Sequence, residues 1–415
     1  MKSNKLNKKK YIGIITSFVN LKKGLLQIHE NLIKEISDNF DKVYLINDQN
    51  LRLFPKLAKK IYLEDFENEN IDVPYKPKNF ELINPKNTTE FDNFCKDKDL
   101  VLINNIGKHF FDLKTLFYLQ KNNVKLIQVM NLGVMKTDKE RPKLFHFIKF
   151  IIFHFNQTIF KKVTVLLSNF RIIPKIEIRF MSDKTVLKNI LKSSFKKFLY
   201  HNKFLYIKEI IEVNSRTYDF FLNTKLDLSE DYIVHLDANL NHRHEIQLRG
   251  KLSEDILEKH YFYLNRFLDK LSQEFNKKII VTIHPAYDLN IHKKYMEDFE
   301  IVKYKTRDFI SKAFLVTHFD SSAITDAIFL KKRVMSLESN YMSQNEKIHS
   351  RYYSTKVGYL HQNLEDDYNF DKDEMLKILN SNIINYDNFI KKFHIIDPNE
   401  SGTKKIVRII KDRFF

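Results

Sequence analysis

Residues 278–285 read Lys-Ile-Ile-Val-Thr-Ile-His-Pro, and this stretch decides how the chain is expected to fold. Its β-branched run predicts a buried strand over Lys278–Ile283, because such side chains pack well on a pleated surface. Proline lacks a backbone donor and fixes φ, so Pro285 ends the strand and holds His284 in one local geometry at its carboxyl end.

The same design recurs on both sides of this stretch, where short apolar runs alternate with longer helical patterns. That alternation indicates a parallel sheet wrapped by helices. The predicted strands of this half are Tyr232–Leu236, Lys278–Ile283, Glu300–Lys303, Phe314–Thr317 and Arg333–Leu337. The predicted helices are Ser253–Phe275, Thr306–Ser311 and Ser321–Leu330.

The first half of the chain repeats the pattern. Its predicted strands are Tyr11–Thr16, Lys42–Ile46, Leu100–Asn104 and Val124–Met130, with helices over Leu25–Ser37 and Asp112–Lys121. The stretches Leu144–Ile211 and Asn214–Leu228 fit neither pattern and are expected to connect the two halves.

A chain of 415 residues exceeds the roughly 250 at which single cores stop growing, so two domains are expected. We predict an α/β protein of two doubly wound, Rossmann-like lobes that face each other across a cleft. Residues 1–225 form the N-terminal lobe and residues 226–415 the C-terminal lobe.

Composition narrows the chemistry. The single cysteine, Cys95, excludes a disulfide framework and a cysteine-based zinc site, and it fits a reducing, cytoplasmic compartment. Neither GxGxxG nor GxxxxGK[ST] occurs, so the chain lacks the standard dinucleotide and P-loop fingerprints, and no cofactor is predicted. The net charge of +18 attracts polyanions, although a lysine- and asparagine-rich composition explains the excess equally well.

In an open α/β sheet, ligands bind beyond the carboxyl ends of the strands. His284 lies at such an end, where it can donate to a phosphate, shuttle a proton or simply form a turn. After the strand Phe314–Thr317 come His318, Asp320, Ser321 and Ser322, at the predicted start of a helix. Asp320 or Ser321 can cap that helix, and the helix start with its two serines can also bind an anion.

The order of strand, His-Pro, helix, strand and Ser-Ser resembles the donor lobe of GT-B glycosyltransferases, chiefly the sialyltransferase-like and Kdo-transferase-like groups. The resemblance covers Tyr232–Leu337 and rests on Ile283-His284-Pro285 and Asp320-Ser321-Ser322-Ala323. It implies that the nucleotide of the donor, typically CMP, is bound by His284, Pro285, His318, Ser321 and Ser322. Lys331-Lys332-Arg333 stands where such enzymes more often have Lys-Pro.

A polar loop follows the first strand of this lobe. Asp237 and Glu245 are its predicted catalytic carboxylates, and Arg243 and His244 are predicted to bind the substrate's anionic groups. A solvated loop without catalytic function is the alternative. His242, His244 and Glu245 are potential metal ligands. Their spacing matches no helix or strand that would bring the three side chains together, so no metal site is predicted.

Two further regions suggest partners. After the strand Leu100–Asn104, Asn105 and Gly107 are predicted to contribute to the acceptor side of the cleft, where His109 and Asp112 are also available. The basic amphipathic segment 141–176 is too short and too interrupted by charge to span a bilayer. It can lie at an anionic membrane surface, or it can be an ordinary buried helix of the first lobe.

The sequence therefore predicts a nucleotide-sugar-dependent glycosyltransferase that acts on a carbohydrate or lipid-linked acceptor, in the cytoplasm or at the inner face of the cell membrane. Related GT-B chemistry is the first alternative, either CDP-glycerol-type phosphotransfer or UDP-sugar epimerisation. A non-catalytic basic protein that binds a membrane or nucleic acid is the second, and nucleic acid is the less expected partner because no recognised binding motif is present.

Overall fold

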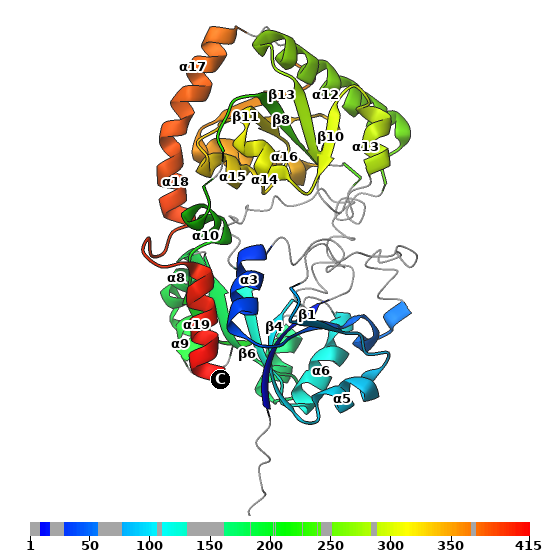
Figure 1. The fold of residues 1–415 in the computed structure, drawn as a ribbon, viewed down its shortest axis with the longest axis vertical. Coiled ribbons are helices and arrows are strands. Elements are labelled where there is room, and N and C mark those ends of the chain that lie inside the picture. The colour runs from blue at the N-terminus through cyan, green and yellow to red at the C-terminus, as the bar shows by residue number, and fades with distance from the viewer. Residues whose placement is uncertain are drawn as a thin grey trace, which may run out of the picture. The chain divides into compact units, whose positions relative to one another are not determined.

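The computed structural model describes residues 9–16, 29–56, 77–105, 110–130, 162–182, 184–201, 203, 205–225, 227–238, 240–241, 251–283, 289–366 and 371–415. These residues form two compact units (Figure 1). The first contains the described residues up to 220 together with 395–415, and the second contains the described residues from 221 to 394.

The first unit is built on a parallel sheet of seven strands in the order β3-β2-β1-β4-β5-β6-β7. The strands are β1 (Lys9–Thr16), β2 (Val43–Asn47), β3 (Phe80–Ile83), β4 (Lys98–Asn104), β5 (Lys125–Met130), β6 (Ile176–Met181) and β7 (Ile207–Glu212). The strand order reverses between the neighbours β1 and β4, which is the topological switch point of a Rossmann-like sheet.

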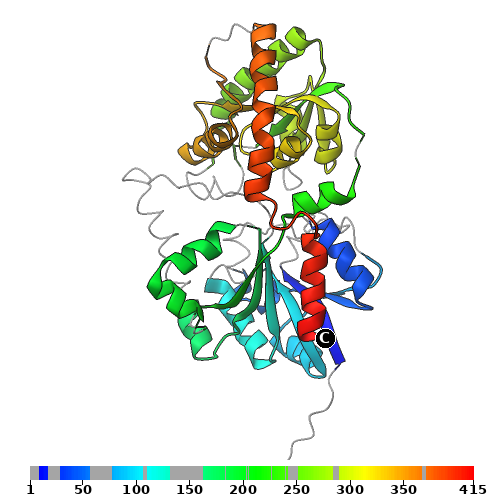
Figure 2. The ribbon, with the colours of Figure 1, turned by 90° about the vertical axis from the view of Figure 1, so that its left-hand side faces the viewer.

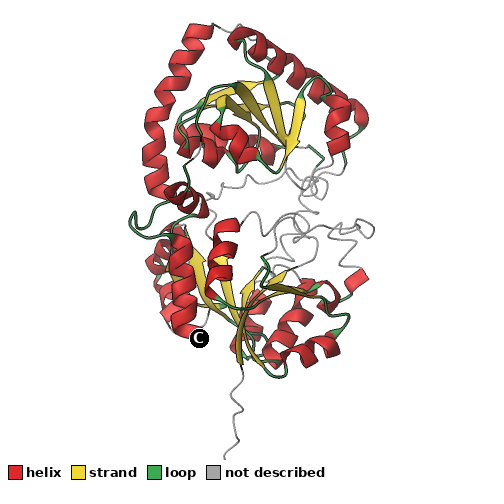
Figure 3. Ribbon diagram, viewed as in Figure 1, coloured by secondary structure: helices red, strands yellow, loops and turns green. Residues whose placement is uncertain are grey.

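Helices cover both faces of this sheet, as Figure 3 shows. Alternate residues of β1 point to opposite faces, and Ile12 and Ile14 join a core with α3 (Glu30–Asn39) and α19 (Gly402–Phe414). Ile15 joins a second core with α5 (Thr88–Cys95) and α6 (Leu113–Lys121). The remaining helical elements of this part are η1 (Gln49–Leu51), η2 (Phe110–Asp112), α8 (Lys184–Lys192), α9 (Ser194–His201) and α10 (Arg216–Asn223).

Gly13 lies inside β1. A Cβ at this position would lie 2.7 Å from the Tyr44 backbone oxygen and 2.9 Å from the Leu102 side chain. The close approach of neighbouring backbones therefore requires glycine here.

Two strands of the first sheet fall inside the stretch Leu144–Ile211 that was expected to connect the lobes, and that expectation is wrong for them. β6 and β7 pair in parallel and extend the sheet at the β5 edge. Their charged residues, such as the paired Glu177 and Lys208, alternate with apolar ones, so neither strand reads as a continuous apolar run. The short strand β3 was also not predicted.

The C-terminal helix α19 belongs to the first unit, whereas the expected boundary at residue 225 puts it in the second lobe. Figure 2 shows α19 (red) beside α3 (blue). The Asp219 carboxylate accepts hydrogen bonds of 2.7 Å from the backbone N–H groups of both Gly402 and Thr403. A carboxylate is stabilised at a helix N-terminus, so this contact holds the start of α19 in place.

The second unit repeats the design with six parallel strands in the order β10-β9-β8-β11-β12-β13. The strands are β8 (Tyr232–Asp237), β9 (Ile279–Ile283), β10 (Glu300–Lys303), β11 (Ala313–His318), β12 (Arg333–Glu338) and β13 (Leu360–Asn363). The order reverses between β8 and β11. Only β13 was not predicted from the sequence.

The helices of the second unit also lie on both sides of its sheet. α12 (Glu254–Phe275) and α17 (Lys372–Asn382) contribute Phe267 and Leu379 to one core with Ile233 of β8. α14 (Thr306–Ser311) and α15 (Ile324–Phe329) contribute the buried Ile310 and Ile328, which lie outside that core. The remaining elements are α13 (Leu289–Tyr295), α16 (Gln344–Val357), η3 (Ile383–Asn385) and α18 (Tyr386–Phe393).

The prediction of two doubly wound, Rossmann-like lobes is thus confirmed for both sheets. That the lobes face each other across a cleft stays a prediction. No helix within the described residues is long and apolar enough to cross a bilayer.

Candidate functional site at the carboxyl edge of the second sheet

Asp237 is the last residue of β8, at the switch point of the second sheet, and its side chain is completely buried. His292 Nε2 lies 2.8 Å from Asp237 Oδ2, and His235 Nε2 lies 3.4 Å from Oδ1. The Tyr261 hydroxyl donates a hydrogen bond of 3.3 Å to Oδ2. The carboxylate is therefore enclosed by two imidazoles and a phenol.

Burial alone raises the pKa of Asp237, but the hydrogen bonds and charges of His235 and His292 outweigh it and hold the pKa far below its usual range. His235 is anchored in turn, because its Nδ1 lies 2.9 Å from the Thr317 hydroxyl of β11. Asp237 is therefore ionised, and its carboxylate contacts the two histidines.

His318, the last residue of β11, is also completely buried. Its Nε2 lies 2.9 Å from the Tyr359 hydroxyl. Burial is the main cause that lowers the pKa of His318 to about 3, so the ring is neutral at physiological pH. The described structure thus places His318 as a core residue that supports the sheet edge.

The Ser-Ser turn lies between β11 and α15. The helix begins at Ile324, and its N-cap Ala323 makes no side-chain cap, so neither Asp320 nor Ser321 has the capping role that the sequence allowed. The Ser321 hydroxyl accepts a hydrogen bond of 3.3 Å from the Ala323 N–H, while Ser322 is exposed.

Asp320 connects this turn to helix α16 (Gln344–Val357), because its Oδ1 lies 3.4 Å from Nδ1 of His349. α16 starts with a capping box in which Ser343 and Glu346 each bond the other's backbone N–H. The capping box fixes the first turn of α16.

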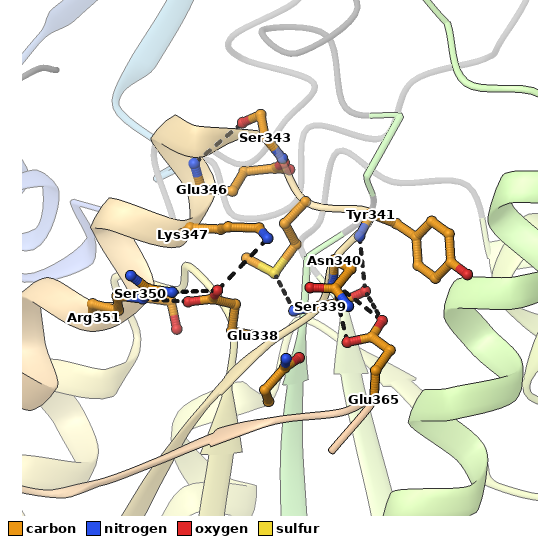
Figure 4. A network of polar contacts seen from close by, with 12 residues as sticks. Glu338, Ser339, Asn340, Tyr341, Ser343, Glu346, Lys347, Ser350, Arg351 and Glu365 are labelled. Carbon is orange, nitrogen blue, oxygen red and sulfur yellow. Dashed lines mark hydrogen bonds and ion pairs between the residues drawn. The ribbon is translucent and has the colours of Figure 1, made fainter.

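A polar cluster that the sequence analysis missed surrounds Glu338, the last residue of β12 (Figure 4). Arg351 donates two hydrogen bonds to Glu338, of 2.5 Å from Nε and 2.6 Å from Nη2. Lys347 Nζ lies 3.6 Å and His361 Nε2 lies 3.3 Å from the carboxylate. Burial raises the pKa of Glu338, but Arg351 above all, with Lys347 and His361, lowers it overall.

This cluster carries two permanent cations against one buried carboxylate. Arg351 reaches the surface, with 59% of its side chain exposed. Burial lowers the pKa of His361, which favours its neutral form. The strand Arg333–Leu337 was predicted, so inspecting the residue that follows it would have pointed to Glu338.

Figure 4 also shows how the loop after β12 is held. The Glu365 carboxylate accepts from the Ser339 hydroxyl at 2.8 Å and from the Asn340 N–H at 3.1 Å. The Ser350 hydroxyl donates to the Leu337 carbonyl at 2.7 Å. The loop and the first turns of α16 are therefore fixed by side-chain bonds at both ends.

Several predicted site residues lie outside the described residues, namely Gly107, His109, His242, Arg243, His244, Glu245, His284 and Pro285. His284 directly follows β9, whose last residue Ile283 is paired in register with Asp237. Among the described residues, no three histidines, cysteines or carboxylates are grouped as a metal site.

In the first sheet, Asn105 follows β4 at the switch point as expected. Its Nδ2 donates a hydrogen bond of 3.1 Å to the Thr16 hydroxyl. Asp112 lies in a buried ion-pair group, in which Arg52 Nε is 3.5 Å from Asp112 Oδ1 and 3.0 Å from Asp48 Oδ2.

No protein-family model and no curated protein sequence matches the chain. Among solved structures, it is similar to a variant of the wall teichoic acid polymerase TagF soaked with CDPG, with 14% identity, a TM-score of 0.53, and 98% of this chain and 88% of that chain covered. Another TagF structure gives 14% identity, a TM-score of 0.51, and coverages of 97% and 89%. The UDP-GlcNAc 2-epimerase of Methanocaldococcus jannaschii, in complex with UDP-GlcNAc and UDP, gives 16% identity, coverages of 97% and 99%, and a TM-score of 0.43. The likeness to TagF over almost the whole chain shows a fold of the GT-B class.

Proposed function

We propose that the chain is a nucleotide-sugar-dependent glycosyltransferase whose donor binds at the carboxyl edge of the second sheet. One observation carries the proposal: the contact between Asp320 and His349 brings the Ser-Ser turn to α16, whose Lys347 and Arg351 add permanent positive charge. Hydroxyl donors and cations at a switch-point edge are suited to the phosphate of a nucleotide donor.

In this reaction the bond between the anomeric carbon and the donor's phosphate oxygen breaks, and a new bond to an acceptor hydroxyl forms. The nucleotide leaves with the bonding electron pair, and the hydroxyl proton passes to a base. Positive charge and hydrogen-bond donors placed at the leaving phosphate stabilise the charge that develops there. Lys347, Arg351 and the Ser321 and Ser322 hydroxyls are the groups that we assign to this task.

The sequence-predicted roles are refined by the geometry. His284 and Pro285 remain the proposed nucleotide contacts after β9, with Arg243 and His244 as donor contacts and Asn105 and Gly107 on the acceptor side. We assign Asp237 a positioning role, because its carboxylate is enclosed by His235 and His292. Glu245 is then the proposed base.

The proposed donor is a CMP-activated nonulosonate or Kdo-type sugar, and the proposed acceptor is a cell-surface polysaccharide or a lipid-linked carbohydrate. The second candidate is a transferase that uses a CDP-linked donor, since one of the similar TagF structures was soaked with CDPG. UDP-sugar epimerisation is the third. The lone buried cysteine is consistent with a cytoplasmic location.

The test measures binding of CMP, CDP and UDP by thermal shift and calorimetry to the wild type and to two arginine variants. Arg351→Ala removes the cation at the carboxyl end of β12 and should weaken nucleotide binding about ten-fold or more, the loss of one charge-assisted contact. Arg333→Ala is the matched control, because Arg333 begins the same strand and pairs with Glu230 at 2.7 Å, at the opposite edge of the sheet. It should bind nucleotide like the wild type.

If CMP binds most tightly, the result favours a nonulosonate or Kdo-type donor. Tightest binding of CDP favours a CDP-linked donor, and tightest binding of UDP favours an epimerase. Equal losses in both arginine variants would remove the Glu338 cluster from the site. Failure of the wild type to bind any nucleotide would remove the enzyme proposal and leave a non-catalytic binding protein.

A further inference from the structure

Helix α9 of the first unit has no buried residue. Phe195 is 70% exposed and Phe198 is 56% exposed, and Lys196 and Lys197 stand between them in the chain. A helix that only covered a core would bury its aromatic side chains, because burial of a phenylalanine is strongly favourable. The two phenylalanines of α9 face water instead.

A second exposed apolar group lies where the helical residues 162–169 end. Phe170 is 71% exposed, and Leu166 and Ile172 are also exposed. Arg171, between Phe170 and Ile172 in the chain, adopts a positive φ of 58° and is itself exposed. This turn therefore presents apolar and basic side chains together.

The two groups are joined through the end of α9. Lys175 Nζ donates to the Lys203 carbonyl at 2.5 Å, which ties the turn to the residue that follows the helix. A hollow of about 620 Å³ lies there, and its lining includes Lys125, Arg171, Lys175, Glu177, Lys203 and Lys208. It lies at the amino ends of β5, β6 and β7, on the edge opposite to the switch-point residues Asn104 and Asn105.

The charge of this region is strongly one-sided. Between residues 162 and 208 the sequence holds eleven lysines and arginines against two acidic residues. Burial, followed by the charge of the neighbouring Lys208, lowers the pKa of Lys175. Such a surface attracts an extended anion.

We propose that α9 and the turn 170–175 form a docking surface for an anionic membrane, with the phenyl rings entering the head-group layer and the lysines contacting lipid phosphates. Aromatic and aliphatic bulk flanked by lysines is the composition of an interfacial segment. The proposed surface spans residues 166–203. For segment 141–176 the sequence left a membrane contact and a buried helix open, and residues 141–161 of that segment lie outside the described residues.

Other occupants fit less well. Nucleic-acid binding uses rings for base stacking, but Leu166 and Ile172 offer no stacking face and lysines outnumber arginines here. A second copy of the chain carries the same excess of positive charge on this surface and is repelled by it. An anionic lipid surface complements both the apolar groups and the charge.

The proposal is tested by sedimentation of the full-length protein with vesicles of phosphatidylcholine alone or with added phosphatidylglycerol. Lys196→Gln with Lys197→Gln should lower the partition coefficient into the anionic vesicles roughly five-fold per lysine. Phe170→Ser with Phe195→Ser should lower it about ten-fold or more at unchanged net charge. The matched controls lie in the second unit: Phe262→Ser, where Phe262 is 62% exposed on α12, and Lys391→Gln with Lys392→Gln on α18.

The expected result is binding to anionic but not to neutral vesicles, weakened by both test variants and by neither control. Thermal unfolding and nucleotide affinity should stay unchanged in all variants, which separates this surface from the proposed donor site. Absence of vesicle binding by the wild type overturns the proposal, as do equal losses in test and control variants. Binding of single-stranded RNA, or self-association in light scattering, that the phenylalanine variant alone abolishes would overturn it in favour of that partner.

Discussion

The two sheets have the same strand order around their switch points, yet their carboxyl edges are built from different chemistry. At the first edge, the Asn105 side chain donates to the Thr16 hydroxyl, and the described charged groups include the ion pair of Arg52 with Asp48. At the second edge, Asp237 is held by two histidines and Glu338 by an arginine, a lysine and a third histidine. These groups differ although the strand order is the same, and the second edge, with Lys347 and Arg351 beside Glu338, is the better candidate for a charged ligand.

The sharpest test of this difference compares Asp48→Ala with Asp237→Ala. Loss of Asp48 removes the 3.0 Å ion pair of the buried Arg52 guanidinium, so the unfolding free energy should fall by about 3–5 kcal/mol. Loss of Asp237 removes a polar partner of two buried imidazoles, so about 1–3 kcal/mol is expected. Chemical denaturation measures both values.

Asp237→Asn completes that comparison, because it keeps the shape and removes the charge. If Asp237 positions the histidines, this variant should retain nucleotide affinity and part of the turnover. A stable variant with full nucleotide affinity and no turnover would show instead that Asp237 is the base. An equal fall in unfolding free energy in the two alanine variants would contradict the proposed difference between the two sheet edges.

Acid should destabilise the second unit through His318, whose pKa is lowered to about 3 mainly by burial. Between pH 6.5 and this value the unfolded chain binds a proton that the folded unit does not, so stability falls as the pH falls. The loss amounts to about 2 kcal/mol by pH 5. His318→Gln should remove that part of the pH dependence, as measured by urea unfolding at pH 7 and pH 5. A pH dependence identical to that of the wild type would show that His318 does not carry it.

The smallest effect on stability is expected at the Ser-Ser turn. The hydroxyls of Ser321 and Ser322 do not cap α15, so Ser321→Ala with Ser322→Ala should change the unfolding free energy by less than about 0.5 kcal/mol. The variant should nevertheless bind a nucleoside monophosphate more weakly, with affinity for the bare nucleoside hardly changed. A loss near 1 kcal/mol with unchanged phosphate binding would restore the capping interpretation.

Much of the fold could be predicted because local pattern and burial agree. β10 and α14 coincide with their predicted ranges, β8, β9 and β12 differ from theirs by one residue at one end, and β11 is longer by one residue at each end. The strands that were missed, β3, β6, β7 and β13, are short or carry polar residues between apolar ones, so their assignment depends on a neighbouring strand. Only the tertiary structure could supply that neighbour.

By itself, the sequence determined two Rossmann-like halves and which polar residues stand at the carboxyl ends of β8, β9 and β11. It could do so because strands of buried residues end where polar residues and proline begin. The tertiary structure decided what those polar residues do. It enclosed Asp237 between His235 and His292, which lie on different elements, and it buried His318 against Tyr359. It also paired Arg351 with Glu338 and packed α19 against the first sheet. Such contacts join residues far apart in the chain, and side-chain burial and pairing depend on the packed neighbours rather than on local spacing.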